Sequence, residues 1–182
     1  LQLLYHINVG PPLLEEGSQF VSAVREMSPR DPRAAEGVES WNRYDGPTPG
    51  YAEQVYYLDP IPDADGNSTV LLKNAAGARG VSVKFDTQGL PCFSLWKNTQ
   101  PAADGYVTGL EPGTNFPNAK PYEREQGRVV SLEPGQSHTM RIELAVHEGH
   151  AAVADRERQI VSLQAGHAGI FHDSPQPGFS PA

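Results

Sequence analysis

Short segments in which apolar and polar residues alternate recur along this chain, and this feature most constrains its fold. In residues 81–85, Val, Val and Phe alternate with Ser and Lys, and residues 140–146 follow the same rule. Such a period of two is typical of a β-strand with one face toward water. With 18 Gly and 17 Pro punctuating the chain, many short strands are expected. The sequence therefore predicts an all-β, antiparallel sandwich.

The predicted strands are bounded by turn residues. The segments 69–73 and 81–85 flank a Gly-containing loop and predict a hairpin. The long connection 28–50 contains four prolines and is expected to hold one helical turn around residues 34–41. The other predicted strands are 1–9, 20–27, 51–59, 90–96, 106–110, 128–132 and 138–146.

The end of the chain has a different composition from the rest. Residues 151–164 predict a short helix whose Asp and Arg residues form a solvated charged face. Residues 166–182 are rich in Gly, Pro, Ser and His, and we expect them to be flexible or loosely draped. The chain is thus divided into a β-domain over residues 1–147 and a helix with a flexible tail over 148–182.

Charge and cysteine content exclude several classes of function. The formal net charge of −8 disfavours nucleic-acid binding, and the scattered Lys and Arg residues form no membrane-binding run. No apolar segment is long enough to span a membrane. The one cysteine, Cys92, cannot form an internal disulfide, which favours a reducing compartment and a cytoplasmic location. The six histidines make no strong metal motif, so neither a metal nor an organic cofactor is expected.

Two polar residues in apolar surroundings are candidates for acid–base chemistry. Glu111 ends an apolar strand at a Pro- and Gly-containing turn, where a carboxylate is held at the rim of a sheet. A surface glutamate before a turn fits the same spacing. His6 lies in a strand that otherwise reads as buried, and histidine titrates near neutral pH. A core histidine bonded to a backbone carbonyl fits that position equally.

A second group of residues has the character of a ligand-binding surface. Trp96 offers an aromatic face beside the cation of Lys97, an arrangement that suits the C–H bonds and hydroxyls of a sugar. Glu53 lies in another predicted strand and is either a ligand-facing acid or a residue on the wet side of that strand. Trp96 also fits a place in the core.

Several of these segments, in order, resemble the aldose 1-epimerase (galactose mutarotase-like) family, and an uncharacterised bacterial branch of it most of all. The segment Gly109-Leu110-Glu111-Pro112-Gly113-Thr114-Asn115-Phe116-Pro117 is similar to the family segment that carries a catalytic glutamate. Residues 132–136, Leu-Glu-Pro-Gly-Gln, are similar to the turn before the family's last strand. The resemblance covers residues 3–147 and implies the C-terminal part of a galactose mutarotase-like β-sandwich that lacks its N-terminal strands.

The resemblance implies roles for individual residues. Glu111 takes the place of the catalytic glutamate, and His6 that of the catalytic histidine, with Asn8 following it. The family has three residues between that histidine and asparagine, whereas this chain has one. Glu53 stands where the family has a sugar-binding aspartate, and Trp96 and Lys97 depart from the family's usual residues. The implied substrate-binding residues are Asn8, Glu53, Trp96 and Lys97.

These observations lead to three hypotheses. The first is an isomerase that interconverts the α and β anomers of an aldose by acid–base ring opening, with a small-molecule sugar as its partner. The second is a non-catalytic carbohydrate-binding or sugar-sensing module, which the altered histidine spacing and Trp96-Lys97 favour. The third is a structural or interaction role, which no motif specifically supports. The identity of the sugar and the oligomeric state stay open.

Overall fold

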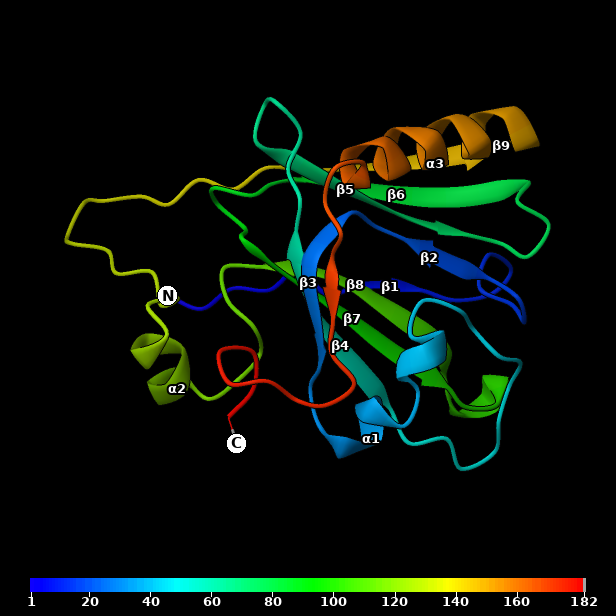
Figure 1. Cartoon of the computed structure of the whole chain (residues 1–182), viewed down its shortest axis with the longest axis horizontal. Coiled ribbons are helices and arrows are strands. Elements are labelled where there is room, and N and C mark those ends of the chain that lie inside the picture. The colour runs from blue at the N-terminus through cyan, green and yellow to red at the C-terminus, as the bar shows by residue number, and fades with distance from the viewer. Residues whose placement is uncertain (182) are drawn as a thin grey trace.

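The fold is a sandwich of two β-sheets, described here for residues 1–181 from a computed structural model (Figure 1). The six-stranded sheet has the order β1-β8-β7-β4-β3-β10, and the four-stranded sheet has the order β2-β5-β6-β9. All neighbouring strands are antiparallel except β10, which pairs with β3 in parallel. The predicted all-β, antiparallel sandwich is confirmed.

The elements follow one another through short turns. The strands are β1 (Ile7–Val9), β2 (Gln19–Val21), β3 (Val24–Pro29), β4 (Gln54–Pro60), β5 (Asn67–Lys73), β6 (Arg79–Asp86), β7 (Cys92–Thr99), β8 (Tyr106–Gly113), β9 (Ile142–Glu148) and β10 (Ile170–Phe171). The helices are α1 (Pro32–Ala35), α2 (Lys120–Glu125) and α3 (His150–Gln164), with 3-10 turns at Val38–Ser40 and Ala102–Asp104.

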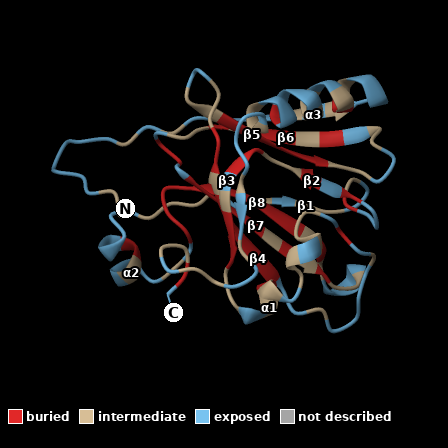
Figure 2. Ribbon diagram, in the orientation of Figure 1, coloured by how far each residue is buried: buried red, intermediate tan, exposed pale blue. Residues whose placement is uncertain are grey.

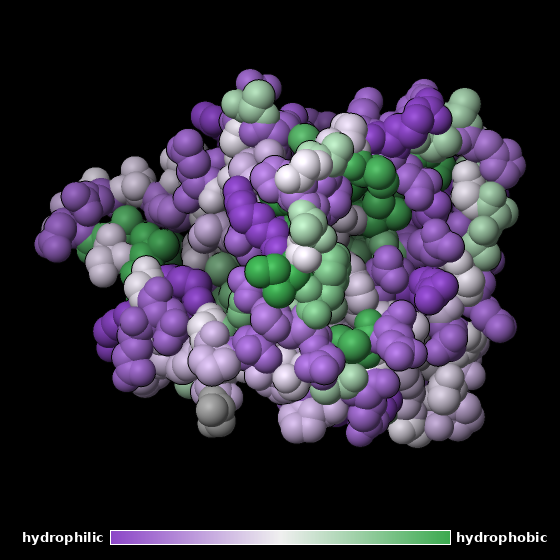
Figure 3. Space-filling model, viewed as in Figure 1, coloured by the Kyte–Doolittle hydropathy of each residue, from purple (hydrophilic) through white to green (hydrophobic). Residues whose placement is uncertain are grey.

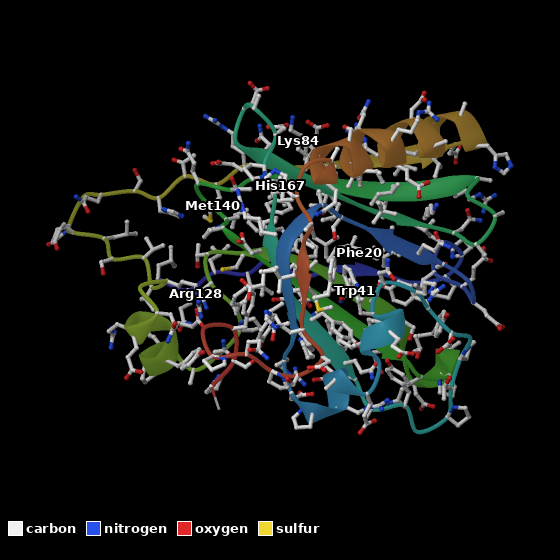
Figure 4. The ribbon with its side chains drawn as sticks, viewed as in Figure 1. Phe20, Trp41, Lys84, Arg128, Met140 and His167 are labelled. Carbon is white, nitrogen blue, oxygen red and sulfur yellow. The ribbon has the colours of Figure 1, made fainter. Side chains whose placement is uncertain are left out.

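Aromatic side chains from both sheets form the centre of the core. The Phe93 ring of β7 stacks between Phe20 of β2, at 5.7 Å, and Phe85 of β6, at 5.6 Å. Trp41, from the 28–50 connection, packs edge-on against Phe20 at 5.9 Å (Figure 4). Buried residues accordingly concentrate along the central strands of both sheets (Figure 2). Burial of these large rings supplies most of the driving force that holds the two sheets together.

Two predicted strands differ from the structure. The predicted strand 20–27 is divided, because the chain leaves the four-stranded sheet after Val21 and enters the six-stranded sheet at Val24. The predicted strand 128–132 is absent from the described structure. Its first residue instead turns back to α2, where the Arg128 guanidinium forms an ion pair with Glu123. By contrast, the predicted hairpin is present as β5 and β6, paired in register from Asn67 to Asp86.

The end of the chain packs on the sandwich. Helix α3 covers the outer face of the four-stranded sheet, where Val153 and Ile160 are buried against Leu71 (Figure 1). We expected residues 166–182 to be loosely draped, but β10 extends the six-stranded sheet along β3. Ile170 and Phe171 are each about half exposed, and apolar residues reach the surface near the centre of the view in Figure 3. The division of domains at residue 147 stays a prediction.

Candidate active site

The candidate site lies on the face of the six-stranded sheet that points away from the four-stranded sheet. Ile7 of β1 pairs with Leu110 of β8, so His6, which precedes β1, lies next to Glu111. Glu111 in turn lies opposite Ser94 of β7. Because side chains alternate between the faces of a strand, the buried Leu110 points into the core and Glu111 points away from it. The register thus brings together two residues that are 105 positions apart in the sequence.

The side chains of Glu111 and His6 are in direct contact but form no hydrogen bond with each other. Their Nε2 and Oε1 atoms lie 3.0 Å apart, with the Glu111 side chain 5% exposed and that of His6 48% exposed. The contact lacks the angular geometry of a hydrogen bond, and buried Oε1 has no other partner among the described residues. A buried carboxylate oxygen without a hydrogen bond is costly, so this oxygen is available to accept one from a ligand.

Gly109 makes the approach of these two side chains possible. A methyl group at Gly109 would lie 2.3 Å from Glu111 Oε1 and 3.2 Å from His6 Cε1. The first distance is far shorter than a carbon–oxygen contact allows. The absence of a side chain at Gly109 therefore leaves the space in which the carboxylate and the imidazole meet.

Burial changes the acidity of Glu111. Desolvation is the largest cause that raises the pKa of Glu111, from 4.5 to about 7. The nearby charge of Glu53 raises it further, whereas Arg30 lowers it. A carboxylate whose pKa lies close to neutral exchanges protons readily at physiological pH, as a general acid or base must.

Trp96 forms one wall of the site and is held by a polar network. Its Nε1 donates a hydrogen bond of 2.6 Å to Glu53 Oε2, and Glu53 Oε1 pairs with Arg30 at 3.1 Å. The Trp96 ring meets the His6 ring edge-on, with centroids 5.4 Å apart. Arg30 also pairs with Asp31 at 2.7 Å. The structure thus brings Glu53, Trp96, His6 and Glu111 together, and it adds Arg30, which sequence reasoning missed.

Asn8 lies on the same face at the edge of the sheet. It is exposed and lies opposite Gly109 in β8, two residues after His6. Gly109 also lies opposite Trp96 in β7. Asn8 and Trp96 are therefore on either side of a strand position that carries no side chain, above which Glu111 Oε1 and His6 Cε1 lie.

Lys97 does not belong to this group. As the neighbour of Trp96 in β7, it points to the other face of the sheet. It is buried there, and its Nζ donates hydrogen bonds to Ser40 O at 3.0 Å and Arg43 O at 2.7 Å. Burial lowers the pKa of Lys97 to about 8. The structure therefore does not bring Lys97 together with Trp96, and Lys97 instead fastens the 28–50 connection to the sheet.

Ser94 and Tyr57 complete the floor and were not found by sequence reasoning. Ser94 lies between Glu111 of β8 and Tyr57 of β4 in the pairing register. Its Oγ is buried and has no hydrogen-bond partner among residues 1–181. Two adjacent buried oxygens, on Ser94 and Glu111, thus face the same side without partners. The available signal was the alternation of Cys92, Ser94 and Trp96 on one face of a strand.

The described residues contain no group of three or more His, Cys, Asp or Glu side chains that is placed to hold a metal ion. Among the same residues, no helix is long and apolar enough to cross a membrane. The chemistry that the groups of the site can offer is proton transfer between a carboxyl group and an imidazole beside an aromatic wall.

Comparisons with known proteins identify a family and a similar solved structure. A family profile described as a domain of unknown function (DUF4432) matches residues 1–146. The crystal structure of a candidate aldose 1-epimerase from Klebsiella pneumoniae subsp. pneumoniae MGH 78578 is 37% identical and superposes with a TM-score of 0.93. The match covers 96% of this chain and 45% of that one, so the chain spans less than half the length of the solved protein. No curated protein matches the chain.

Proposed function

The chain belongs to the family described as a domain of unknown function (DUF4432), and we propose that it carries the acid–base pair of an aldose 1-epimerase-like protein. The substrate class is a cyclic aldose, and the reaction interconverts its α and β anomers. The likeness to a solved candidate aldose 1-epimerase at 37% identity supports this assignment.

One observation carries the proposal. Glu111 is buried and has a carboxylate oxygen without a hydrogen bond, yet that oxygen lies 3.0 Å from the imidazole of a half-exposed histidine. Desolvation raises the pKa of Glu111 to about 7, which suits proton transfer in either direction near neutral pH. A purely structural glutamate would be paired instead, because an unpaired buried carboxylate lowers stability.

The proposed reaction needs only these two groups. The sugar enters above Gly109 and separates the two side chains, so that O1 faces Glu111 and the ring oxygen faces His6. Glu111 takes the proton of the O1 hydroxyl while protonated His6 gives its proton to the ring oxygen. The bond between C1 and the ring oxygen breaks, and C1 becomes an aldehyde carbon. Rotation about C1–C2 and ring closure on the opposite face, with the proton transfers reversed, yield the other anomer.

The remaining residues position the sugar. Trp96 offers its ring to the C–H bonds of the pyranose, and the 2.6 Å hydrogen bond to Glu53 fixes the plane of that ring. Asn8 and Ser94 offer hydrogen-bonding groups to sugar hydroxyls. The reaction requires no metal or organic cofactor. The single cysteine, Cys92, is free and buried, in keeping with a proposed cytoplasmic location.

A non-catalytic carbohydrate-binding module is the second candidate. The direct contact between His6 and Glu111 favours it, because a sugar must open this contact before the two groups can flank C1. The single residue between His6 and Asn8 favours it too. This alternative predicts saturable sugar binding without anomer exchange.

Anomer exchange measured by NMR decides between the two candidates. The full-length protein is added to a panel of free aldoses, and exchange between α and β signals is compared for wild type, Glu111→Gln and Glu143→Gln. Glu143 is an exposed glutamate of β9 and serves as the matched control. We expect the Glu111 variant to lose about 10²–10⁴-fold in exchange rate and the control to keep the wild-type rate. Wild-type exchange in the Glu111 variant would refute the assignment, and binding without exchange would establish the module.

A further inference from the structure

The C-terminal residues 172–180, here called the C-terminal strap, follow the edge of the six-stranded sheet and then cross onto the face of the candidate site. Backbone N–H of His172 donates to Met27 O at 3.0 Å, which continues the pairing of β10 with β3. Backbone N–H of Gln176 then donates to Ser28 Oγ at 3.1 Å. Ser28 lies opposite Tyr57 in the register and therefore shares the face that carries Glu111. The strap thus reaches the floor of the site.

A set of hydrogen bonds fixes the strap in this position. Nδ2 of Asn118 donates to Phe179 O at 2.7 Å, and the guanidinium of Arg128 donates to Gly178 O at 2.6 Å. Figure 4 shows Arg128 beside α2 and the C-terminal segment. The hydroxyl of Tyr122 donates to Ser180 O at 2.8 Å and accepts from Gly178 N at 3.1 Å. Because these contacts satisfy the backbone on both sides of Phe179, its side chain is held in one place.

The Phe179 ring extends a row of aromatic rings that begins at the floor of the site. Tyr57 stacks on Phe116 with centroids 4.6 Å apart, and Phe116 meets Phe179 at 5.3 Å. Phe179 and Trp96 are both partly buried, and both pack against the same cluster of Val55, Tyr57, Cys92 and Phe116. Two partly exposed aromatic rings therefore border one apolar floor.

We propose that the C-terminal strap is a part of the ligand site, in which Phe179 forms the wall opposite Trp96 and determines which sugars fit. This inference rests on the proposed function. It assigns a binding role to a segment that lies beyond residues 1–146, which the family profile matches. An apolar ring at this position favours a sugar that presents a C–H face to it and disfavours a polar or charged substituent there.

Sugar affinity is the first test. Dissociation constants for D-glucose and D-galactose are measured by NMR titration of wild type, Phe179→Ala and Phe171→Ala. Phe171 is the matched control, because it belongs to the same C-terminal segment but is 52% exposed and contacts Trp41. We expect Phe179→Ala to weaken binding about tenfold, as the loss of one aromatic contact implies, and Phe171→Ala to change it less than twofold. Equal affinity of wild type and Phe179→Ala would overturn the proposal.

A second measurement needs no ligand. The part of the strap that crosses the site is removed by ending the chain after Pro175, and the carboxyl group of Glu111 is titrated by NMR in wild type and in the shortened protein. If the strap shields the site from water, its removal lowers the midpoint of Glu111 by about one pH unit. If wild type binds neither of these two sugars, the titration alone decides the role of the strap, while the exchange assay on the wider panel of aldoses decides the proposed function. An unchanged midpoint in that case would overturn the role proposed for the strap.

Discussion

Two buried glutamates of this protein have opposite surroundings. Glu123 of α2 is fully buried, and both of its carboxylate oxygens bind the Arg128 guanidinium, at 2.6 and 2.8 Å. Asn118 donates a further hydrogen bond to it at 2.7 Å. Glu111 is also buried, with 5% of its side chain exposed, but its Oε1 has no hydrogen bond and its neighbour is a histidine. The comparison separates a carboxylate whose charge is compensated by a cation and hydrogen bonds from one whose Oε1 is left without a hydrogen bond.

The difference follows from the general cost of burying charge. A buried carboxylate is tolerated when a cation and hydrogen bonds replace its water, as around Glu123. Where this replacement is missing, as at Glu111, the group resists ionisation and the protein loses stability at neutral pH. Such a loss is expected at sites retained for function.

Removal of Arg128, the ion-pair partner of Glu123, is expected to have the largest effect, a loss of free energy of unfolding. Arg128→Ala leaves a fully buried carboxylate without its cation and also releases Gly178 O. We expect the free energy of unfolding to fall by about 3–5 kcal/mol. Denaturant titration at pH 7 checks this value, and a loss below about 1 kcal/mol would contradict the structural role given to Glu123.

Gly109→Ala tests whether the close contact between Glu111 and His6 is needed for anomer exchange. A methyl group there would displace Glu111 and His6 from one another. A displacement of about 1 Å is expected to reduce anomer exchange about 10²-fold, with circular dichroism and the melting temperature recorded to show that the fold is retained. A folded variant with the wild-type exchange rate would show that the contact between the two residues is not needed.

Glu111→Gln is expected to stabilise the protein, in contrast to any change at Glu123. Because the folded-state pKa of Glu111 is raised from 4.5 to about 7, the folded protein favours the protonated carboxyl. The contribution of this group to stability is complete below pH 4.5 and is lost as the pH rises through about 7. The variant should match wild type at pH 4 and exceed it by about 2–3 kcal/mol at pH 8. Denaturation at both pH values checks the sign, and destabilisation at pH 8 would contradict it.

Glu53→Gln is expected to have the smallest effect, a slight change in the pKa of Glu111. It tests whether the charge of Glu53 contributes to the raised pKa. Removal of this negative charge lowers the pKa of Glu111, because Glu53 contributes to its rise. The shift is expected to be a few tenths of a pH unit, because Glu53 is exposed and screened by salt. Titration of the Glu111 carboxyl by NMR checks it, with Glu143→Gln as the distant control. A rise of the midpoint would contradict the electrostatic account.

Sequence reasoning predicted the parts of the fold in which local pattern and tertiary structure agree. The alternation in residues 81–85 predicted the hairpin because one face of β6 packs in the core while the other is wetter. Glu111 and His6 were identified as a pair through the resemblance of their segments. Their contact depends on the register of β1 with β8, which no local pattern specifies.

Other residues were missed or misplaced for physical reasons. Trp96 and Lys97 were assigned to one ligand surface, although neighbouring residues of a strand point to opposite faces. Arg30 joins the site only because β3 and β4 pair and bring it to Glu53. The C-terminal strap has a polar, Gly- and Pro-rich composition and is held by Asn118, Tyr122 and Arg128, which are more than 45 residues away in the sequence. The composition of the strap therefore did not indicate where it lies in the fold.

We propose that Glu111 is a buried carboxyl, without a hydrogen bond at Oε1, that is poised for proton transfer. Titration of its side-chain carboxyl carbon by NMR in the wild-type protein tests this most directly. We expect a midpoint at about 7, well above the ordinary 4.5. A midpoint at or below 4.5 would show that Glu111 is as well stabilised in its charged form as an ordinary glutamate, and it would contradict the account.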